Sequence, residues 1–271
     1  DATVLSRWAG DLEEPSDSAT FFNILDTHDG VGLMGVKEIL PAEEIRFVID
    51  RAMEHGAYIS YKMTEARTEE PYEINSTWWS ALNRDDTDEG IAFQVKRYVA
   101  SRSIALVIRG VPAIYAHGAI GTPNDHEWVR RTGVKRDVNR GLILARRMEE
   151  RLKYPGSRHS LLRSWAIRTQ VNRTRQRAFH PHGPQRVLML SPDVFAVFRT
   201  SPEGEDHILA LTNVTNHACT LTVPLSGLGQ DESRWFDIVN EREWTGRKGR
   251  LTITLHPYDV LWLRPVSEVE R

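Results

Sequence analysis

The chain has 271 residues, of which 40% are hydrophobic and 27% are charged, and its formal net charge is -2. This length and composition describe a globular chain that can bury a sizeable core, in one large domain or two ordinary ones. The near-neutral charge gives no reason to expect a polyanion partner for the whole chain, and no apolar run approaches the roughly 18 residues of a membrane helix.

The N-terminus and the cysteine content bear on the cellular compartment. The first residues have neither the basic start nor the apolar stretch of a signal peptide. The single cysteine, Cys219, cannot form an internal disulfide, and no Cys/His cluster has the spacing of a structural zinc site. We therefore expect a cytoplasmic protein without a metal. Because the sequence begins at Asp1 and not at Met, we also expect a fragment or a processed chain.

One segment is strongly basic. Residues 130–186 contain 16 Lys or Arg against three Asp or Glu, an excess that could suggest nucleic-acid binding. The arginines recur at helical spacing around apolar residues such as Ile143, Met148 and Leu162, which is typical of the solvated faces of two helices over about residues 138–177. We therefore expect neither a nucleic-acid partner nor a membrane partner.

The first 180 residues alternate between helical and strand patterns. We expect a short helix over residues 1–12 closed by the turn Pro15-Ser16-Asp17, a buried strand over 20–25, a helix over 41–55 that ends at Gly56, and a strand over 57–61. A long helix carries apolar residues from Ile91 to Leu106, and a second buried strand follows at 113–116. The glycines between residues 118 and 133 predict a mobile loop.

The character of the sequence changes after residues 180–184, where His-Pro-His-Gly-Pro marks a boundary. Short alternating runs separated by turn residues at near-regular intervals then indicate an antiparallel β domain. These runs are residues 187–190, 194–199, 207–214, 218–223, 234–238, 251–255 and 259–263.

The stretch over residues 20–35 carries the first candidate for chemistry. A short apolar run stops at His28 and Asp29, and three glycines follow within six residues. Such a pattern is typical of a buried strand that delivers ionisable side chains to its C-terminal end, where a parallel α/β barrel keeps its chemistry. An ordinary Asx turn would use the same His-Asp-Gly residues, so this alternative stays open at this point.

Three later stretches, residues 71–79, 110–115 and 136–140, follow in a characteristic order and spacing. Together with residues 20–35 they resemble the sucrose phosphorylase-like branch of glycoside hydrolase family 13, the α-amylase superfamily. The resemblance implies an α/β fold: the C-terminal part of a (β/α)8 TIM barrel with an inserted subdomain, followed by an all-β antiparallel sandwich domain. It assigns residues 1–29 and 86–180 to the end of the barrel, 30–85 to the inserted acceptor-site subdomain, and 181–271 to the sandwich.

The resemblance also implies roles for residues of the glucose pocket. His28 and Asp29 match a pair that binds the hydroxyls of the glucosyl ring, with Asp29 as a catalytic transition-state stabiliser. A carboxylate in a partly dry pocket stabilises the positive charge that develops on an oxocarbenium-like centre. Arg136 matches an arginine that closes the pocket, although an ion pair with Asp137 or another loop acid is an alternative. Arg140 is expected to anchor the loop.

The acceptor side of the site is implied by the inserted segment. Tyr72 matches a tyrosine that helps bind phosphate or fructose, and Lys62 could add a cation. Glu73 departs from the glutamine usual in sucrose phosphorylases and matches relatives that act on glucosylglycerate, glucosylglycerol or sucrose 6'-phosphate. The resemblance therefore favours a substrate other than sucrose.

These residues lead to a functional hypothesis. We expect a retaining phosphorylase that transfers glucose from a small α-glucoside, such as glucosylglycerate, to inorganic phosphate and releases α-glucose 1-phosphate, with no cofactor and with the glucoside and phosphate as its partners. The family takes its nucleophile and its general acid from the fourth and fifth barrel strands, and neither strand is in this sequence. The alternatives are a sucrose phosphorylase, an amylase-type hydrolase or transglucosidase, and an inactive carbohydrate-binding remnant. A homodimer is left open.

Overall fold

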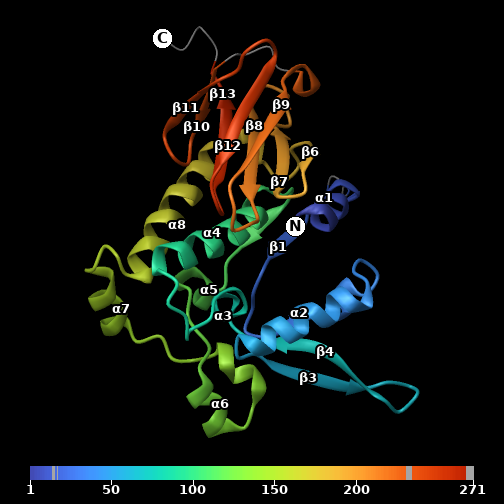
Figure 1. The fold of residues 1–271 in the computed structure, drawn as a ribbon, viewed down its shortest axis with the longest axis vertical. Coiled ribbons are helices and arrows are strands. Elements are labelled where there is room, and N and C mark those ends of the chain that lie inside the picture. The colour runs from blue at the N-terminus through green and yellow to red at the C-terminus, as the bar shows by residue number, and fades with distance from the viewer. Residues whose placement is uncertain (14–15, 17, 230–233, 267–271) are drawn as a thin grey trace. The chain divides into compact units, whose positions relative to one another are not determined.

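The structure is a computed structural model that describes residues 1–13, 16, 18–229 and 234–266 (Figure 1). Its residues fall into two compact units. The first contains Asp1–Asn23, Val99–Pro112 and Trp165–Arg271, and the second contains Ile24–Tyr98 and Ala113–Ser164. The turn expected at Pro15-Ser16-Asp17 rests on residues 15 and 17, which lie outside the described residues. The limits expected for the three domains stay predictions.

The first unit is built on antiparallel strands (Figure 1). Its larger sheet has the order β11-β10-β13-β8-β7-β6, and β9 pairs with β12 in a second sheet. The strands are β6 (Gln185–Ser191), β7 (Val194–Thr200), β8 (His207–Asn213), β9 (Cys219–Pro224), β10 (Arg234–Asp237), β11 (Arg242–Thr245), β12 (Arg250–Leu255) and β13 (Val260–Pro265). The helical elements that lie wholly within this unit are α1 (Thr3–Gly10), η3 (Arg177–Phe179) and η4 (Ser226–Leu228).

The two sheets share one apolar core. Alternate residues of β9 and β12 are buried, such as Leu221 on β9 and Ile253 on β12, and they belong to the same cluster as Leu209 and Leu211 on β8. Buried and exposed residues alternate in this way along strands that turn one face to a core and the other to solvent. The antiparallel β domain expected from the sequence is therefore confirmed, and each of its seven expected runs contains a strand. Within the described residues of this domain, the strand that the pattern missed is β11, whose sequence Arg-Glu-Trp-Thr is mostly polar.

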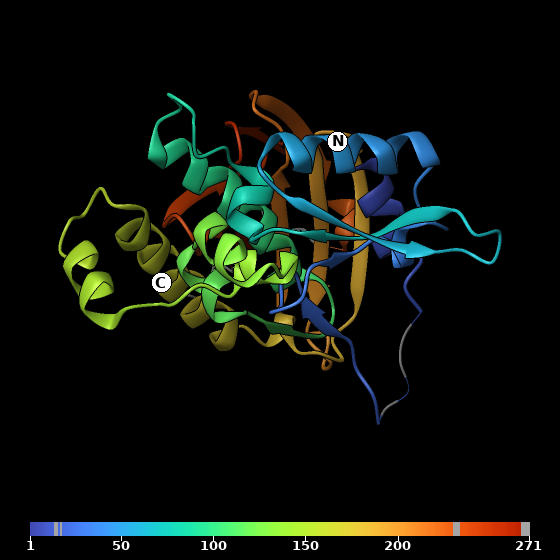
Figure 2. The ribbon, with the colours of Figure 1, turned by 90° about the horizontal axis from the view of Figure 1, so that it is seen from below.

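The second unit contains a small three-stranded sheet in the order β2-β4-β3, formed by β2 (Val31–Gly32), β3 (Tyr58–Met63) and β4 (Glu69–Asn75). The helix α2 (Ala42–Glu54) lies along the β3–β4 hairpin (Figures 1 and 2). Ile49 and Ala52 on α2 form a core cluster with Ile59 on β3 and Ile74 on β4. The 3-10 helix η1 (Met34–Val36) precedes α2.

The remaining helices of the second unit are short. They are α3 (Trp78–Leu82), α5 (Ala116–Ile120), α6 (His126–Thr132), η2 (Lys135–Asn139) and α7 (Ala145–Leu152). Two longer helices, α4 (Ile91–Val107) and α8 (Arg158–Arg175), contribute residues to both units. Trp79 on α3 is 1% exposed and packs with Tyr98 at 5.2 Å between ring centroids.

The mobile loop expected over residues 118–133 is wrong, because this segment contains parts of α5 and α6. Gly121 and Gly133 are the left-handed C-caps of these two helices, with φ of 60° and 72°. Asp125 caps α6 by accepting a hydrogen bond from the Trp128 backbone amide at 2.8 Å. The glycines therefore end helices here, which is their common role at a C-cap.

The two strands expected to be buried are β1 (Phe22–Ile24) and β5 (Val111–Ala113), which form a two-stranded sheet. The second strand lies at 111–113 and not at 113–116, because Ala116 already begins α5. Burial of β1 was a wrong expectation for this chain, since Phe22 is 68% exposed and a two-stranded sheet leaves both faces uncovered. Among the described residues no helix is long and apolar enough to cross a membrane.

Candidate active site

The site is positioned by the pairing of β2 with β4, which brings the turn after β1 next to Glu73. Gly32 pairs with Glu73 in the antiparallel register. Gly30 lies so close to β4 that a Cβ atom on it would fall 2.6 Å from both the Glu73 Cγ and the Ile74 carbonyl oxygen. The residue after Asp29 must therefore be glycine for β4 to approach, and this approach lets the Gly30 amide donate to Glu73 Oε1 at 3.2 Å.

Glu73 holds Arg136 with two contacts. Arg136 Nη2 lies 2.9 Å from Glu73 Oε1, and Arg136 Nε donates to Glu73 Oε2 at 3.1 Å. The Glu73 side chain is only 5% exposed, so this bidentate pair is shielded from water on the carboxylate side. The hydrogen bonds and charge of Glu73, with smaller effects from Asp29 and Tyr72, raise the pKa of Arg136.

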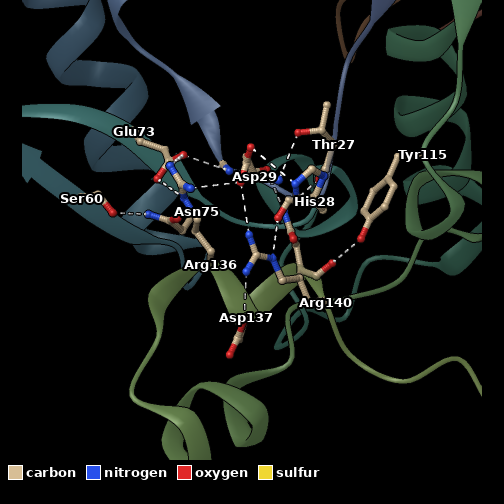
Figure 3. Close-up of polar contacts among 12 residues, drawn as sticks. Thr27, His28, Asp29, Ser60, Glu73, Asn75, Tyr115, Arg136, Asp137 and Arg140 are labelled. Atoms are coloured by element: carbon tan, nitrogen blue, oxygen red, sulfur yellow. Dashed lines mark hydrogen bonds and ion pairs between the residues drawn. The ribbon is translucent and has the colours of Figure 1, made fainter.

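Asp29 meets two arginines (Figure 3). Its Oδ1 atom lies 3.1 Å from Arg136 Nη1 and 3.2 Å from Arg140 Nη2. The Asp29 side chain is 42% exposed, and His28 Nε2 lies 3.7 Å from its Oδ2 atom. We call Asp29, Glu73, Arg136 and Arg140 the ionic cluster. Its formal charges balance, and its Asp29 carboxylate still faces solvent on one side.

The backbone of the turn that carries Asp29 is clamped by η2 and the residue after it. Asn139 Nδ2 donates to the carbonyl oxygens of Thr27 at 3.2 Å and Asp29 at 3.0 Å, and Arg140 Nε donates to the His28 carbonyl at 2.8 Å. Tyr115 in turn donates to the Asn139 carbonyl at 3.2 Å. Three consecutive carbonyls are thus fixed by two neighbouring side chains, which holds in place the backbone that carries the Asp29 side chain.

The structure brings together most of the site residues expected from the sequence. His28, Asp29, Glu73 and Arg136 lie in one neighbourhood, and the half-buried Tyr72 precedes Glu73 on β4. The alternative for Arg136 was an ion pair with Asp137 or another loop acid. Arg136 pairs with Asp29 in the turn after β1 and with Glu73 on β4, whereas Asp137 lies 3.4 Å from Arg140. The roles of these residues stay predictions.

One expectation about the acceptor side, a cation supplied by Lys62, is not supported by contacts. Lys62 lies 3.2 Å from Glu70, which also receives Lys37 at 2.7 Å, and these two lysines lower the pKa of Glu70. The charge of Lys62 is thus already compensated on the hairpin. Asn139 is the residue that the sequence analysis missed, although its place in the Arg-Asp-Val-Asn-Arg stretch was the available signal.

Comparison with known proteins gives a consistent result. No model of a known protein family matches the sequence. The glucosylglycerate phosphorylase of Spirochaeta thermophila is 32% identical over 276 residues, covering 99% of this chain and 46% of that enzyme. The sucrose phosphorylase of Streptococcus mutans is 33% identical over 136 residues, covering 49% of this chain and 26% of that enzyme. The chain therefore spans less than half the length of these relatives.

The fold has a counterpart among solved structures. The crystal structure of sucrose 6F-phosphate phosphorylase from Thermoanaerobacter thermosaccharolyticum superposes with a TM-score of 0.63 at 19% sequence identity, covering 90% of this chain and 44% of that one. The expected fold is confirmed: the end of a (β/α)8 barrel with an inserted subdomain, followed by an antiparallel β domain. These similarities are consistent with the C-terminal half of such an enzyme. By them the chain belongs to the sucrose phosphorylase-like branch of glycoside hydrolase family 13.

Proposed function

We propose that the protein carrying this chain is a retaining glucoside phosphorylase that transfers glucose from a glucosylglycerate-like α-glucoside to phosphate and yields α-glucose 1-phosphate. The observation that carries this proposal is the ionic cluster at the end of β1. It offers a carboxylate fixed through its own backbone, and an arginine that a second, buried carboxylate holds in place. The similarity to a glucosylglycerate phosphorylase over 99% of the chain supports the choice of substrate.

Asp29 is suited to stabilise charge in the transition state. Its backbone is held by Asn139, so its carboxylate needs little reorganisation when positive charge develops on the glucosyl ring. Hydrogen bonds from sugar hydroxyls to such a carboxylate strengthen as that charge grows. Asp29 acts here beside the nucleophile and the general acid, which we expect to lie outside this chain.

Arg136 is suited to exchange partners. Its two contacts with Glu73 hold the guanidinium in place, whereas its single contact with Asp29 at 3.1 Å can give way to a sugar hydroxyl. A planar guanidinium also pairs well with carboxylate and phosphate groups, so Arg136 is placed to meet either the anionic acceptor or the incoming phosphate. Tyr72 and His28 complete the proposed substrate contacts.

The first test is phosphate-dependent release of glucose 1-phosphate by the full-length protein. Glucosylglycerate, glucosylglycerol, sucrose and sucrose 6'-phosphate are offered side by side, and we expect the highest rate with glucosylglycerate. Glucose released at equal rates without phosphate would mean a hydrolase. Release from none of the four substrates would contradict the proposal.

The second test is Asp29→Asn, which keeps the shape of the side chain and removes its charge. We expect turnover to fall about 100-fold or more, because the lost group acts on transition-state charge. The melting temperature should stay close to that of the wild type, since Asp29 is partly exposed. Near-wild-type turnover would remove Asp29 from the catalytic machinery.

The second candidate function is a sucrose phosphorylase, and the 33% identity to the Streptococcus mutans enzyme favours it. The same four-substrate assay distinguishes it, because sucrose would then be the preferred donor.

We further propose that the protein is cytoplasmic, uses phosphate as its co-substrate without a metal or organic cofactor, and has no nucleic-acid or membrane partner. A homodimer is compatible with this proposal.

A further inference from the structure

A hollow lined by cations lies in the second unit and shares no residue with the ionic cluster. It has an empty volume of about 520 Å³, part of which is open to solvent. Its walls come from α5, the segment 142–144, α7 and the first residues of α8. Its polar lining is Arg147, Arg151, Arg158, His159 and Thr122, and its apolar lining includes Ile120, Leu142, Ile143, Leu144 and Met148.

The lining of this hollow is positively charged, and the acid nearest to it in effect is Asp85, whose charge acts on Arg158 from outside the lining. No Asp or Glu is among its lining residues. Within the described part of the chain, the side chains of Arg147 and Arg151 make no ion pair or hydrogen bond. Arg146, on the same short helix but outside the hollow, lies 3.5 Å from Glu150 and so has a partner. The two lining arginines of α7 are thus available to a ligand.

Arg158 is held at the base of the hollow with part of its hydrogen-bonding capacity unused. Its guanidinium lies over the ring of Trp79, 4.8 Å from the centroid, and its buried Nε atom has no partner among the described residues. Burial and the charge of Arg151 lower the pKa of Arg158, while Asp85 acts in the opposite direction. A nearby anion would stabilise the charged form of an arginine in this environment.

His159 adds a donor. It is 7% exposed and has no hydrogen-bond partner within the described residues. Burial, followed by the charges of Arg158 and Arg151, lowers its pKa to about 4, so the ring is neutral at pH 7 and carries one N–H. His159 is also the second residue of α8, an 18-residue helix whose N-terminal end carries a partial positive charge.

We propose that this hollow binds a phosphate group, paired with the guanidinium groups of Arg147, Arg151 and Arg158 and hydrogen-bonded by His159. Three guanidinium groups suit a doubly charged phosphate better than they suit a singly charged carboxylate. Arginine also pairs with phosphate in a bidentate geometry. The apolar wall formed by Leu144 and Met148 would contact the carbon atoms of a phosphate monoester. This second phosphate site goes beyond the proposed function, because it does not depend on phosphorolysis at Asp29.

The test is a calorimetric titration of the full-length protein with inorganic phosphate and, separately, with glucose 1-phosphate at low ionic strength. The test variant is the double substitution R147Q/R151Q. The matched control is R146Q/R163Q, which removes the same total charge from outside the hollow, with one arginine on α7 and one on α8. Besides any binding at the Asp29 site, we expect wild type and control to show one binding event that R147Q/R151Q weakens at least tenfold, while binding at the Asp29 site stays unchanged. The single variants R147Q and R151Q replace the double variant if its melting temperature falls.

Each result of the titration either supports or overturns the phosphate site. Equal affinity and stoichiometry in R147Q/R151Q and R146Q/R163Q would overturn the site, as would the absence of any phosphate binding by the wild type. Tighter binding of glucose 1-phosphate than of inorganic phosphate at this site supports a monoester ligand, and the reverse order supports free phosphate. The two proposals can fail separately. If the protein releases no glucose 1-phosphate from any donor but R147Q/R151Q loses a binding event, the proposed function is refuted and this site is supported.

Discussion

At the scale of single residues, Glu73 decides how Arg136 is held. It accepts two contacts from Arg136 and one hydrogen bond from the Gly30 amide, while its side chain is almost fully buried. A glutamine at this position can still accept from Gly30 but carries no charge to hold Arg136 against Asp29. The residue that the resemblance assigns to the acceptor side is thus the one whose carboxylate holds Arg136 in the structure.

We therefore predict that Glu73→Gln in the full-length protein changes the choice of substrate. The ratio of initial phosphorolysis rates on glucosylglycerate and sucrose should shift about tenfold, equivalent to about 1.4 kcal/mol. Glu70→Gln is the control, because it removes a carboxylate of the same strand that pairs with Lys37 and Lys62 instead. If both variants keep the wild-type ratio, Glu73 serves only the structure.

His159 predicts a pH dependence of stability. Its pKa is lowered from 6.5 to about 4 by burial and by Arg158 and Arg151. The folded state therefore favours neutral His159, so this contribution to the free energy of unfolding is complete above about pH 6.5 and is lost as the pH falls toward 4. The loss amounts to at most about 3 kcal/mol, since one pKa unit corresponds to about 1.4 kcal/mol.

The measurement is the melting temperature of wild type and His159→Gln between pH 7 and pH 4 in phosphate-free buffer. We expect the variant to lose less stability over this range than the wild type. His256→Gln, which replaces an exposed histidine of the β domain, should follow the wild-type curve. Parallel curves for wild type and His159→Gln would contradict the assignment.

At the scale of elements, the left-handed C-caps of α5 and α6 allow a matched comparison. A Cβ atom on Gly121 would fall 2.6 Å from Leu162 Cδ1 and 2.9 Å from Trp79 Cε3, whereas nothing lies within 4 Å of one on Gly133. We predict that Gly133→Ala costs about 1 kcal/mol for the left-handed backbone alone. Gly121→Ala should cost about 1–3 kcal/mol more, because it also overpacks Trp79 and Leu162.

Denaturant unfolding of the two variants under identical conditions measures this difference. The comparison is informative because both glycines end short helices and differ mainly in their surroundings. Equal losses in the two variants would mean that α5 moves away from Trp79 at little cost, and that the packing beneath the hollow is loose.

These same elements show what the sequence could and could not predict. The β domain and α2 were predictable, because alternation and a 3.6-residue period span several residues in each. Helices of five and seven residues, such as α5 and α6, are too short to show a period, so their glycines predicted a loop. The motifs identified Asp29, Glu73 and Arg136. The contacts of Arg136 with Glu73 and Asp29, however, join residues that are 63 or more positions apart in the sequence. Such contacts depend on the pairing of β2 with β4, which no local pattern encodes.

At the scale of the whole molecule, the chain exposes apolar side chains on β1 and on α2. Phe22 and Ile24 lie two residues apart on β1 and are 68% and 38% exposed, and Phe47 on α2 is 63% exposed. Uncovered strands and apolar patches of this kind promote association between copies. We therefore predict that the 271-residue chain self-associates when it is produced alone, and that the same residues do not cause association of the full-length protein.

Sedimentation velocity at two protein concentrations tests this prediction. The isolated chain should show a concentration-dependent increase in mean sedimentation coefficient, and Phe22→Ser combined with Phe47→Ser should reduce it. Tyr154→Ser is the control, because it removes an aromatic side chain that is 69% exposed near the end of α7, away from β1 and α2 in the sequence. If the control reduces association as much as the double variant, general surface hydrophobicity is responsible. A monodisperse monomer at both concentrations would show that the exposed face of β1 does not drive association.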